Sequence, residues 1–391
     1  MIPAAKKVKL VSQRCDGLAR FGYQMKRTET QSAKRLTTCR FMHVSCGIGP
    51  SGLIVLCFLF SLLVFDCRVG SAQSASVDSS AEVAAAVTAQ ADGQAAQEPT
   101  QFDAQRAFEH LKSICEIGPR VSASKGMKKQ RDYLKEHFEE LGGKFYTQPF
   151  RVRSPYNGKL VQLDNIIIQF HPERKKRLLI CCHHDTRPFP DSDRFNPRGV
   201  FIGANDGASG VGLLCELGRH MQDLDGKFGV DFVFFDGEEF VIQRPRDQMF
   251  LGSTYFAQEY AAGKLKVNYS YGILVDMVAD KDLQIYLEGN SLGYADGLTR
   301  SVWTVAKDLG VKEFIPKQRH HIRDDHLPLN SIARIQTVDI IDFDYPNTVR
   351  GNSYWHTEQD TVENCSAESL GKVGSVVLEW LRRIQKLNKG K

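Results

Sequence analysis

The stretch of residues 231–240, Asp-Phe-Val-Phe-Phe-Asp-Gly-Glu-Glu-Phe, constrains the fold of this chain more than any other. Its apolar run at residues 232–235 is typical of a buried central strand, and Asp236-Gly237 is typical of the turn that ends such a strand. In α/β sheets, the loops beyond the carboxyl ends of strands hold ligands and catalytic groups. Glu238 and Glu239 follow at that place, and their mutual repulsion requires a cation or a shared proton nearby. The simpler alternative is an acidic turn on the surface.

The charge of the chain is distributed unevenly, and this excludes one class of partner. The chain has 391 residues, of which 42% are hydrophobic and 25% charged, as in an ordinary globular protein. Its net charge of +5 arises in residues 1–50, where ten Lys and Arg face only Asp16 and Glu29, a local charge of +8. By difference, residues 51–391 carry −3 and are weakly acidic. Nucleic-acid binding therefore has no compositional support, and no nucleic-acid partner is expected.

The first hundred residues are expected to lie outside the catalytic domain. Residues 52–65 form an uncharged apolar run of 14 residues, which is short for a membrane span and suits the core of a signal peptide. We predict a basic region with a signal peptide or a membrane anchor over residues 1–72, and therefore export to the periplasm or the medium. A membrane would be contacted only through residues 52–65. Residues 73–100 are rich in Ala, Ser and Gln without any aromatic residue, which predicts a linker.

Residues 101–388 alternate between apolar runs of strand length and amphipathic segments of helical periodicity. Strands are expected at residues 144–152, 165–170, 178–182, 232–235, 271–275, 283–287 and 336–341, and helices at residues 102–117, 125–141, 211–221, 253–262, 291–309 and 367–386. This order predicts a single α/β domain with a mostly parallel central mixed β-sheet flanked by helices. Cys181, Cys182 and Cys215 fall inside expected strands or helices, which favours core residues over a disulfide framework.

Carboxylates and imidazoles follow the predicted strands or lie in Gly- and Asp-rich turns. They belong to His183, Asp185, Asp206, Glu238, Glu239, Asp276, Asp324, Asp325, His326 and His356. Each alone has a simpler explanation, because a strand-end aspartate is often a helix cap. Together they suit Zn²⁺, which favours imidazole nitrogen and carboxylate oxygen and takes three protein ligands in catalytic sites. No dinucleotide-binding glycine fingerprint follows the first expected strand, and Cys181, Cys182 and Cys215 lie inside expected strands and helices rather than beside a helix start. Metal-dependent chemistry is therefore favoured.

Five motifs carry a more specific resemblance. They are Cys182-His-His-Asp-Thr, Gly203-Ala-Asn-Asp206, Phe234-Phe-Asp-Gly-Glu-Glu239, Asp324-Asp-His326 and Trp355-His-Thr357. In this order they resemble the zinc aminopeptidase (M28) clan, and most closely its glutaminyl-peptide cyclotransferases, or glutaminyl cyclases. The resemblance covers about residues 103–388. It implies a zinc-exopeptidase-like fold and an enzyme whose substrates are the N-termini of peptides or proteins.

The cyclotransferase subgroup implies one zinc ion and one set of roles. Its members convert an N-terminal glutamine to pyroglutamate and release ammonia. The positions that match the zinc ligands are Asp206, Glu239 and His356. The resemblance also implies that Glu238 is the base, that Asp276 and Asp324 hold Glu238 in place, and that Trp355 lines the substrate pocket. For Trp355, packing in the core is the simpler alternative.

The aminopeptidase subgroup is the alternative, and it implies two zinc ions. There the metal ligands match His183, Asp206, Glu239, Asp276 and His356, and the base that matches Glu238 activates water to hydrolyse the first peptide bond. Because His183 and Asp276 are both present in this sequence, the ligands for a second zinc ion are available.

Some features of the sequence favour the cyclotransferase subgroup, and others depart from the pattern of that subgroup. The motif that begins at Asp324, the position of Trp355 directly before His356, and the length of the insertion between Glu239 and Gly252 all favour the cyclotransferase. Two features depart from its pattern. Asp339 stands where cyclotransferases have a histidine, and residues 347–351 lengthen the loop before Trp355. The oligomeric state is left open.

Overall fold

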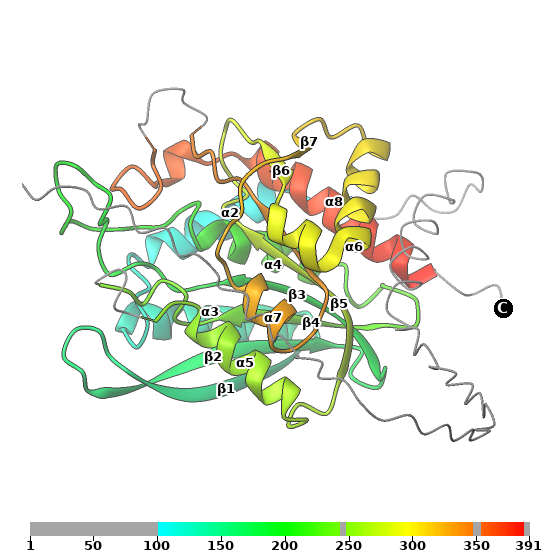
Figure 1. The fold of residues 1–391 in the computed structure, drawn as a ribbon, viewed down its shortest axis with the longest axis horizontal. Helices are drawn as coiled ribbons and strands as arrows, with labels where there is room; N and C mark the ends of the chain where they lie inside the picture. Colours follow the sequence, from blue (N-terminus) through cyan, green and yellow to red (C-terminus); the bar gives the residue numbers. More distant parts are fainter. Residues whose placement is uncertain (1–100, 243–247, 347–352, 387–391) are drawn as a thin grey trace, which may run out of the picture. The chain divides into compact units, whose positions relative to one another are not determined.

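The computed structural model describes residues 101–242, 248–346 and 353–386 (Figure 1). The predicted signal peptide or anchor of residues 1–72, the predicted linker of residues 73–100 and the loop addition at residues 347–351 lie outside the described residues. Within the described part, no helix combines the length and the apolar character that crossing a membrane requires.

A six-stranded sheet organises the described domain, in the order β1-β2-β4-β3-β5-β8. The strands are β1 (Lys144–Arg153), β2 (Leu160–Phe170), β3 (Lys176–His183), β4 (Gly229–Phe235), β5 (Asn268–Asp276) and β8 (Thr337–Ile341). β4, β3, β5 and β8 run parallel, whereas β1 pairs antiparallel with β2 and β2 antiparallel with β4. The predicted α/β class and mixed sheet are confirmed. The expectation of a mostly parallel sheet is wrong, because β1 and β2 are joined by a short turn that permits only antiparallel pairing.

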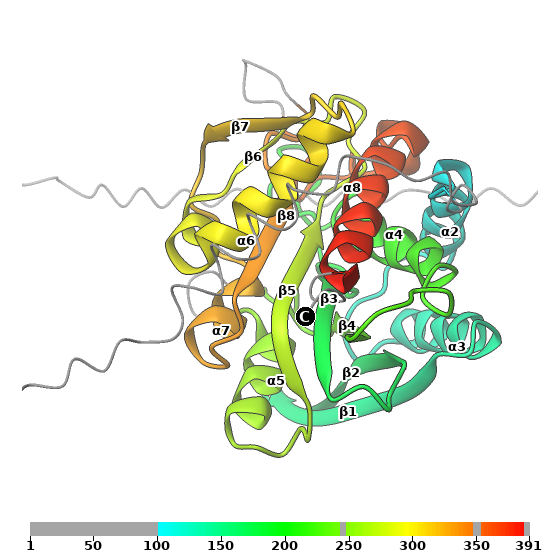
Figure 2. The ribbon, with the colours of Figure 1, turned by 90° about the vertical axis from the view of Figure 1, so that its right-hand side faces the viewer.

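Helices cover both faces of the sheet. One face is covered by α2 (Ala104–Glu116), α3 (Lys125–Glu140), α4 (Ala208–Gly218), α6 (Gly289–Asp308) and α8 (Ala367–Lys386). The other face is covered by α5 (Leu251–Ala261) and α7 (His326–Ser331). Figure 2 shows α4 and α8 on one side of β3 and β5, and α5 on the opposite side.

The central strands are buried on both faces, as parallel strands between two helical layers must be. Along β3, Leu178 and Ile180 pack into the core beneath α2, α4 and α8, whereas Leu179 packs into the core beneath α5. Cys181 and Cys182 continue this alternation. The five cysteines in the described part are buried and unpaired, so the prediction of core residues is confirmed for Cys181, Cys182 and Cys215.

Two short elements escaped sequence analysis. Strand β7 (Phe314–Gln318) pairs with β6 (Ile285–Leu287) in a separate two-stranded sheet, and only the first residue of β7 is buried. Helix α7 has six residues and contains Pro328. Neither element is long enough to produce a recognisable hydrophobic period.

A buried ion pair holds the amino ends of the central strands together. Arg177 of β3 and Asp231 of β4 are almost completely buried, and the Arg177 Nε donates to Asp231 Oδ1 at 2.8 Å. The hydroxyl of Tyr269 on β5 donates to Asp231 Oδ2 at 2.6 Å. Arg177 also donates to the carbonyl oxygens of Phe170 and Val230, so the N–H groups of its buried guanidinium are hydrogen-bonded as well as paired with Asp231.

We expect Asp231→Asn to lower the free energy of unfolding by about 3–5 kcal/mol, because the substitution leaves the buried Arg177 guanidinium without its counter-charge. Urea denaturation would measure this. Asp132→Asn is the matched control, because it breaks the exposed Lys128–Asp132 pair, which contributes little. Equal stability of the two variants would contradict the assigned role of the buried pair.

Candidate active site

The predicted site residues converge at one edge of the sheet. His183 and Asp276 are the last residues of β3 and β5, and Glu238 follows the end of β4 after a two-residue turn. Gly237 in this turn has a left-handed φ of 83°, and a Cβ there would lie 2.6 Å from a Leu163 side-chain atom, so only glycine fits. Because β3, β4 and β5 run parallel, their carboxyl ends bring these side chains to the same place.

Asp206, Glu239 and His356 form one compact set of three buried candidate ligands. His356 Nε2 lies 3.1 Å from Glu239 Oε1 and 3.4 Å from Asp206 Oδ2. Asp206 Oδ2 is buried yet makes no hydrogen bond within the described residues. His356 has a left-handed φ of 58°, a strained conformation that aims its ring at the two carboxylates. Two carboxylate oxygens and one imidazole nitrogen fit Zn²⁺, which keeps a fourth position open when it is catalytic.

A buried arginine and a second aspartate support this ligand set. Arg187 donates to Glu239 Oε2, so only the other oxygen of Glu239 faces His356. Arg187 also pairs with Asp191 at 2.7 Å, and Asp191 lies 3.3 Å from His356 Nδ1. A carboxylate at the far ring nitrogen is the usual partner of a metal-binding histidine, because it fixes the tautomer and the orientation of the ring.

The backbone of the ligand residues is held by two more buried carboxylates. Asp185 accepts the backbone N–H groups of Glu238 and Glu239 at 3.2 and 3.0 Å. Asp360 accepts the N–H groups of Asn205 and Asp206 at 2.7 and 3.1 Å. Each carboxylate therefore fixes a turn that carries functional side chains.

A second group of candidate ligands adjoins the first and shares Asp206 with it. His183 Nε2 lies 3.1 Å from Asp276 Oδ1 and 3.2 Å from Asp206 Oδ1. Burial opposes the charged imidazole, but Asp276 and the neighbouring aspartates raise the pKa of His183 well above its usual value. The two proposed second-metal residues are thus in contact with each other and with the first ligand set.

Glu238, Asp276 and Asp324 are buried carboxylates with perturbed acidity. Burial and the neighbouring Glu239 raise the pKa of Glu238 well above its ordinary value. Burial and Asp276 raise the pKa of Asp324 to about 7. Burial also raises the pKa of Asp276, against the opposing effect of His183. Such a group cannot be fully ionised near neutral pH without a cation, so it holds at least one proton in common.

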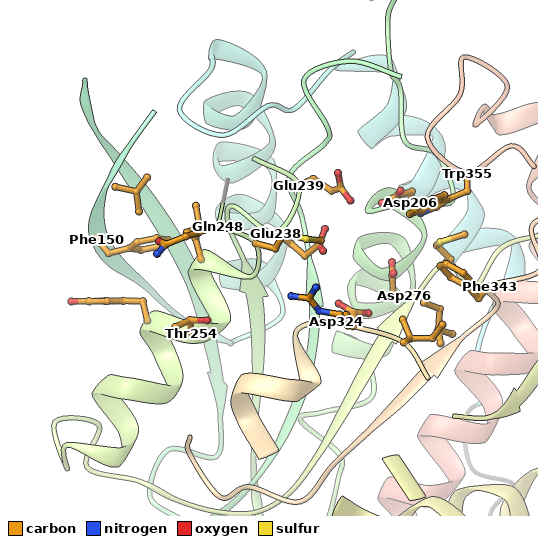
Figure 3. A pocket seen from close by; sticks show the side chains of 18 of the residues that line it. Phe150, Asp206, Glu238, Glu239, Gln248, Thr254, Asp276, Asp324, Phe343 and Trp355 are labelled. Carbon is orange, nitrogen blue, oxygen red and sulfur yellow. The ribbon is translucent and has the colours of Figure 1, made fainter. Parts of the chain in front are cut away.

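A cavity of about 780 Å³ opens onto these groups (Figure 3). Its lining includes Asp206, Glu238, Asp324, Phe343 and Trp355. The Trp355 ring stacks on the His356 ring with centroids 3.7 Å apart, and Phe343 packs edge-on against Trp355 at 5.5 Å. Trp355 is half-buried. One part of it lies on the cavity wall, and it also packs against a small apolar cluster of Met277, Ile322, Ile341 and Tyr345.

The three residues of the motif at 324–326 lie in two different places, at the cavity and in the core. Only Asp324 lines the cavity. Asp325 accepts a hydrogen bond from Ser253, and His326 is fully buried, 3.4 Å from Glu288 and 3.5 Å from Asp339. Asp339, which replaces the expected histidine, therefore faces His326 behind the cavity wall.

Several supporting residues were not assigned roles from the sequence. Asp185 was flagged as part of the motif after β3, but not as the acceptor of the two glutamate N–H groups. Arg187, Asp191 and Asp360 carried no recognisable signal, although each lies within five residues of a motif. Their roles depend on contacts between loops that are distant in the sequence.

We expect Asp185→Asn to weaken zinc binding by about 10–100-fold while the fold persists, as is typical when a residue that supports metal ligands is changed. The new amide NH₂ would face the N–H group of Glu238 or Glu239, so one donor would lose its acceptor. Competition against a chelator would measure the affinity. Asp193→Asn is the control in the same loop, because among the described residues Asp193 accepts N–H groups from Phe195, Asn196 and Glu358 and from neither glutamate. Unchanged zinc affinity in Asp185→Asn would contradict the assigned role.

Comparison with known proteins agrees with this geometry. Residues 165–381 match the family model of peptidase family M28. The glutaminyl-peptide cyclotransferase of Bothrops jararaca is 26% identical over 302 residues, which cover 67% of this chain and 77% of that protein. The crystal structure of Fimbriiglobus ruber glutaminyl cyclase is 36% identical, with a TM-score of 0.69 over 75% of this chain and 99% of that one.

The relatives also include an enzyme named for the alternative activity. A leucine aminopeptidase precursor from Bacteroides thetaiotaomicron is 34% identical, with a TM-score of 0.67 over 73% of this chain and 99% of that one. Family membership and fold are therefore secure, whereas the names of the relatives cover both subgroups. The chain belongs to peptidase family M28, as an enzyme of the glutaminyl-cyclase type.

Proposed function

We propose that this protein converts the N-terminal glutamine of peptides or proteins to pyroglutamate and releases ammonia. The observation that carries the proposal is the position of Trp355, which stacks on the ligand His356 and lines the cavity. This ring supplies an apolar wall for the glutamine side chain at the place where its carboxamide meets the ligand set. The glutaminyl cyclases among the relatives support the same reaction.

Asp206, Glu239 and His356 would hold one Zn²⁺ ion. Three observations support this fit. Asp206 Oδ2 is buried without a hydrogen bond to the described residues, and it lies near His356 Nε2, so that one imidazole nitrogen and two carboxylate oxygens are available together. Asp191 lies beside the other ring nitrogen of His356 and holds the ring in place. When bound, the ion supplies Lewis-acid polarisation of the γ-carboxamide oxygen.

Glu238 would move the proton during ring closure. The α-amine nitrogen of the substrate attacks the γ-carboxamide carbon, and Glu238 takes a proton from that nitrogen. As the carbon–nitrogen bond of the amide breaks, Glu238 returns one proton to the departing NH₂ group, which leaves as ammonia. Both reacting groups belong to one residue, so the five-membered ring closes without an enzyme nucleophile.

Asp276 and Asp324 would keep Glu238 in place and would hold a proton in common with it. All three carboxylates line the same cavity, and burial raises the pKa of each. A proton held among them lowers the negative charge of the group, so that Glu238 exchanges a proton with the substrate at a smaller electrostatic cost.

One observation favours a second candidate, a two-zinc aminopeptidase. His183, Asp206 and Asp276 offer ligand atoms that lie within 4.8 Å of one another beside the first set. In that case Glu238 would take a proton from water, and the first peptide carbonyl would be the group attacked. The leucine aminopeptidase precursor among the relatives is consistent with this reading of the site.

Both candidates predict that Glu238→Gln lowers turnover by about 10²–10⁴-fold, because the amide cannot accept the proton. Zinc content should stay unchanged, because Glu238 is not in the ligand set of Asp206, Glu239 and His356. Steady-state kinetics and elemental analysis of the same preparation would test this. Near wild-type turnover in the variant would exclude both mechanisms.

Zinc content and substrate choice separate the two candidates. For the cyclase, we expect one zinc ion per chain, release of ammonia from Gln-AMC (AMC, 7-amino-4-methylcoumarin) and no free AMC from Leu-AMC. His183→Gln should then keep its zinc. Two zinc ions per chain, one of them lost in His183→Gln, together with free AMC from Leu-AMC, would establish the aminopeptidase instead.

A further inference from the structure

The cavity continues beyond the proposed glutamine pocket. Figure 3 shows Glu238 and Asp324 between an aromatic side, with Phe343 and Trp355, and an opposite arm that contains Phe150 and Thr254. The volume of about 780 Å³ lies in the range of pockets that hold a whole small ligand. The arm therefore has room for the residues that follow the N-terminal glutamine.

The end of β1 and one side of α5 form the walls of this arm. Phe150 stacks on Tyr255 with ring centroids 5.1 Å apart. Val152 and Thr254 line the arm beside them. This wall is fixed by packing, since Phe150 is buried in a small core of its own with Leu163 and Phe240.

Two arginines, Arg151 and Arg323, line the cavity. Arg151 and Arg323 are exposed, and neither forms an ion pair or a side-chain hydrogen bond with any described residue. The buried Arg177 and Arg187 of this chain differ, because carboxylates and carbonyl oxygens occupy their guanidinium groups. Arg151 and Arg323 are therefore available to a ligand.

Arg323 also lies directly before Asp324 in the chain, beside the most acidic part of the cavity. The carboxylates of Glu238, Asp276 and Asp324 would repel an acidic substrate. A guanidinium at the cavity wall reverses this effect locally, and its planar fork binds a carboxylate through two parallel hydrogen bonds.

We propose that Arg151 and Arg323 form a carboxylate-binding subsite for the residues that directly follow the N-terminal glutamine. The inference rests on the proposed function and names its substrate class: peptides whose second or third position carries a carboxylate. The α-amine would then lie at the carboxylates of the catalytic group and the substrate carboxylate at the arginines. Two sources supply such a carboxylate, an acidic side chain or the free C-terminus of a short peptide.

Binding and turnover of four peptides test the proposal. Gln-Ala-Ala-NH₂ is neutral, Gln-Glu-Ala-NH₂ carries an acidic side chain, Gln-Ala-Ala-OH carries a free C-terminus and Gln-Lys-Ala-NH₂ is cationic. Dissociation constants would be measured by calorimetry on zinc-loaded Glu238→Gln protein, which does not consume the peptide. Pyroglutamate formation would be measured on the same peptides with wild-type protein.

We expect either carboxylate peptide to bind about 3- to 10-fold more tightly than the neutral peptide, as a partly exposed guanidinium contact allows. The cationic peptide should bind more weakly than the neutral one. Arg151→Gln/Arg323→Gln should bring the ratio close to one, and 1 M salt should do the same because screening then acts within about 3 Å. The identity of the tighter-binding peptide shows whether the side chain or the C-terminus is bound.

Arg153→Gln is the matched control. Arg153 is exposed on the same strand two residues away, its guanidinium donates to the Gly158 carbonyl, and it does not line the cavity. The control should keep the wild-type ratio. If the double variant does not fold, each single variant replaces it.

A neutral peptide that binds as tightly as both carboxylate peptides would overturn the proposal, as would an unchanged ratio in the arginine variants. Failure of the proposed function has a different signature. In that case no peptide yields pyroglutamate with wild-type protein, and the binding ratio still decides whether the subsite exists.

Discussion

The carboxylate of Asp185 is the contact on which the catalytic edge of the sheet depends. It lies just beyond β3 and accepts the backbone N–H groups of Glu238 and Glu239, which lie just beyond β4. The proposed base and a proposed zinc ligand are adjacent in sequence but face different partners. A common anchor for both N–H groups lets one turn present the two side chains in different directions. Gly237 makes this turn sterically accessible.

Many carboxylates are buried at one edge of the sheet, and their negative charges must be paired or neutralised. The surroundings of Glu239 and of Glu238 achieve this in different ways. Behind the ligand set, Arg187 and His356 lower the pKa of Glu239 against the opposing effect of burial, so that its carboxylate stays ionised. Around Glu238 the balance is reversed, because burial and neighbouring acids raise its pKa. These two environments suit the proposed roles of Glu239 as a zinc ligand and of Glu238 as the group that exchanges a proton. Separation of acidity between adjacent groups is a common basis for acid–base catalysis.

The elements that the amino-acid sequence predicts best are the completely buried ones. The strand before Glu238 and the α/β class could be predicted, because apolar runs are local signals. The convergence of Asp206, Glu239 and His356 at one edge of the sheet could also be predicted, since all three belong to recognisable motifs. Their role as zinc ligands stays a prediction. The direction of β1 and β2 was less accessible, since pairing depends on which strands become neighbours. Helix α7 was missed because six residues around a proline give no periodicity. Predictions for residues 1–100 lie outside the described residues.

The sequence by itself determined which chemical groups are present and, through the order of its motifs, the family whose fold unites them. Only the tertiary structure decided which of these groups line the cavity, which are buried behind it, and which partners each of them has. Asp324 and Asp325 are adjacent, yet one lines the cavity and the other contacts Ser253 in the core. Arg187 carries no motif, yet it occupies one oxygen of Glu239. The physical reason is that the acidity and the partners of a buried charged group depend on every neighbour within a few ångströms, and those neighbours come from distant parts of the chain.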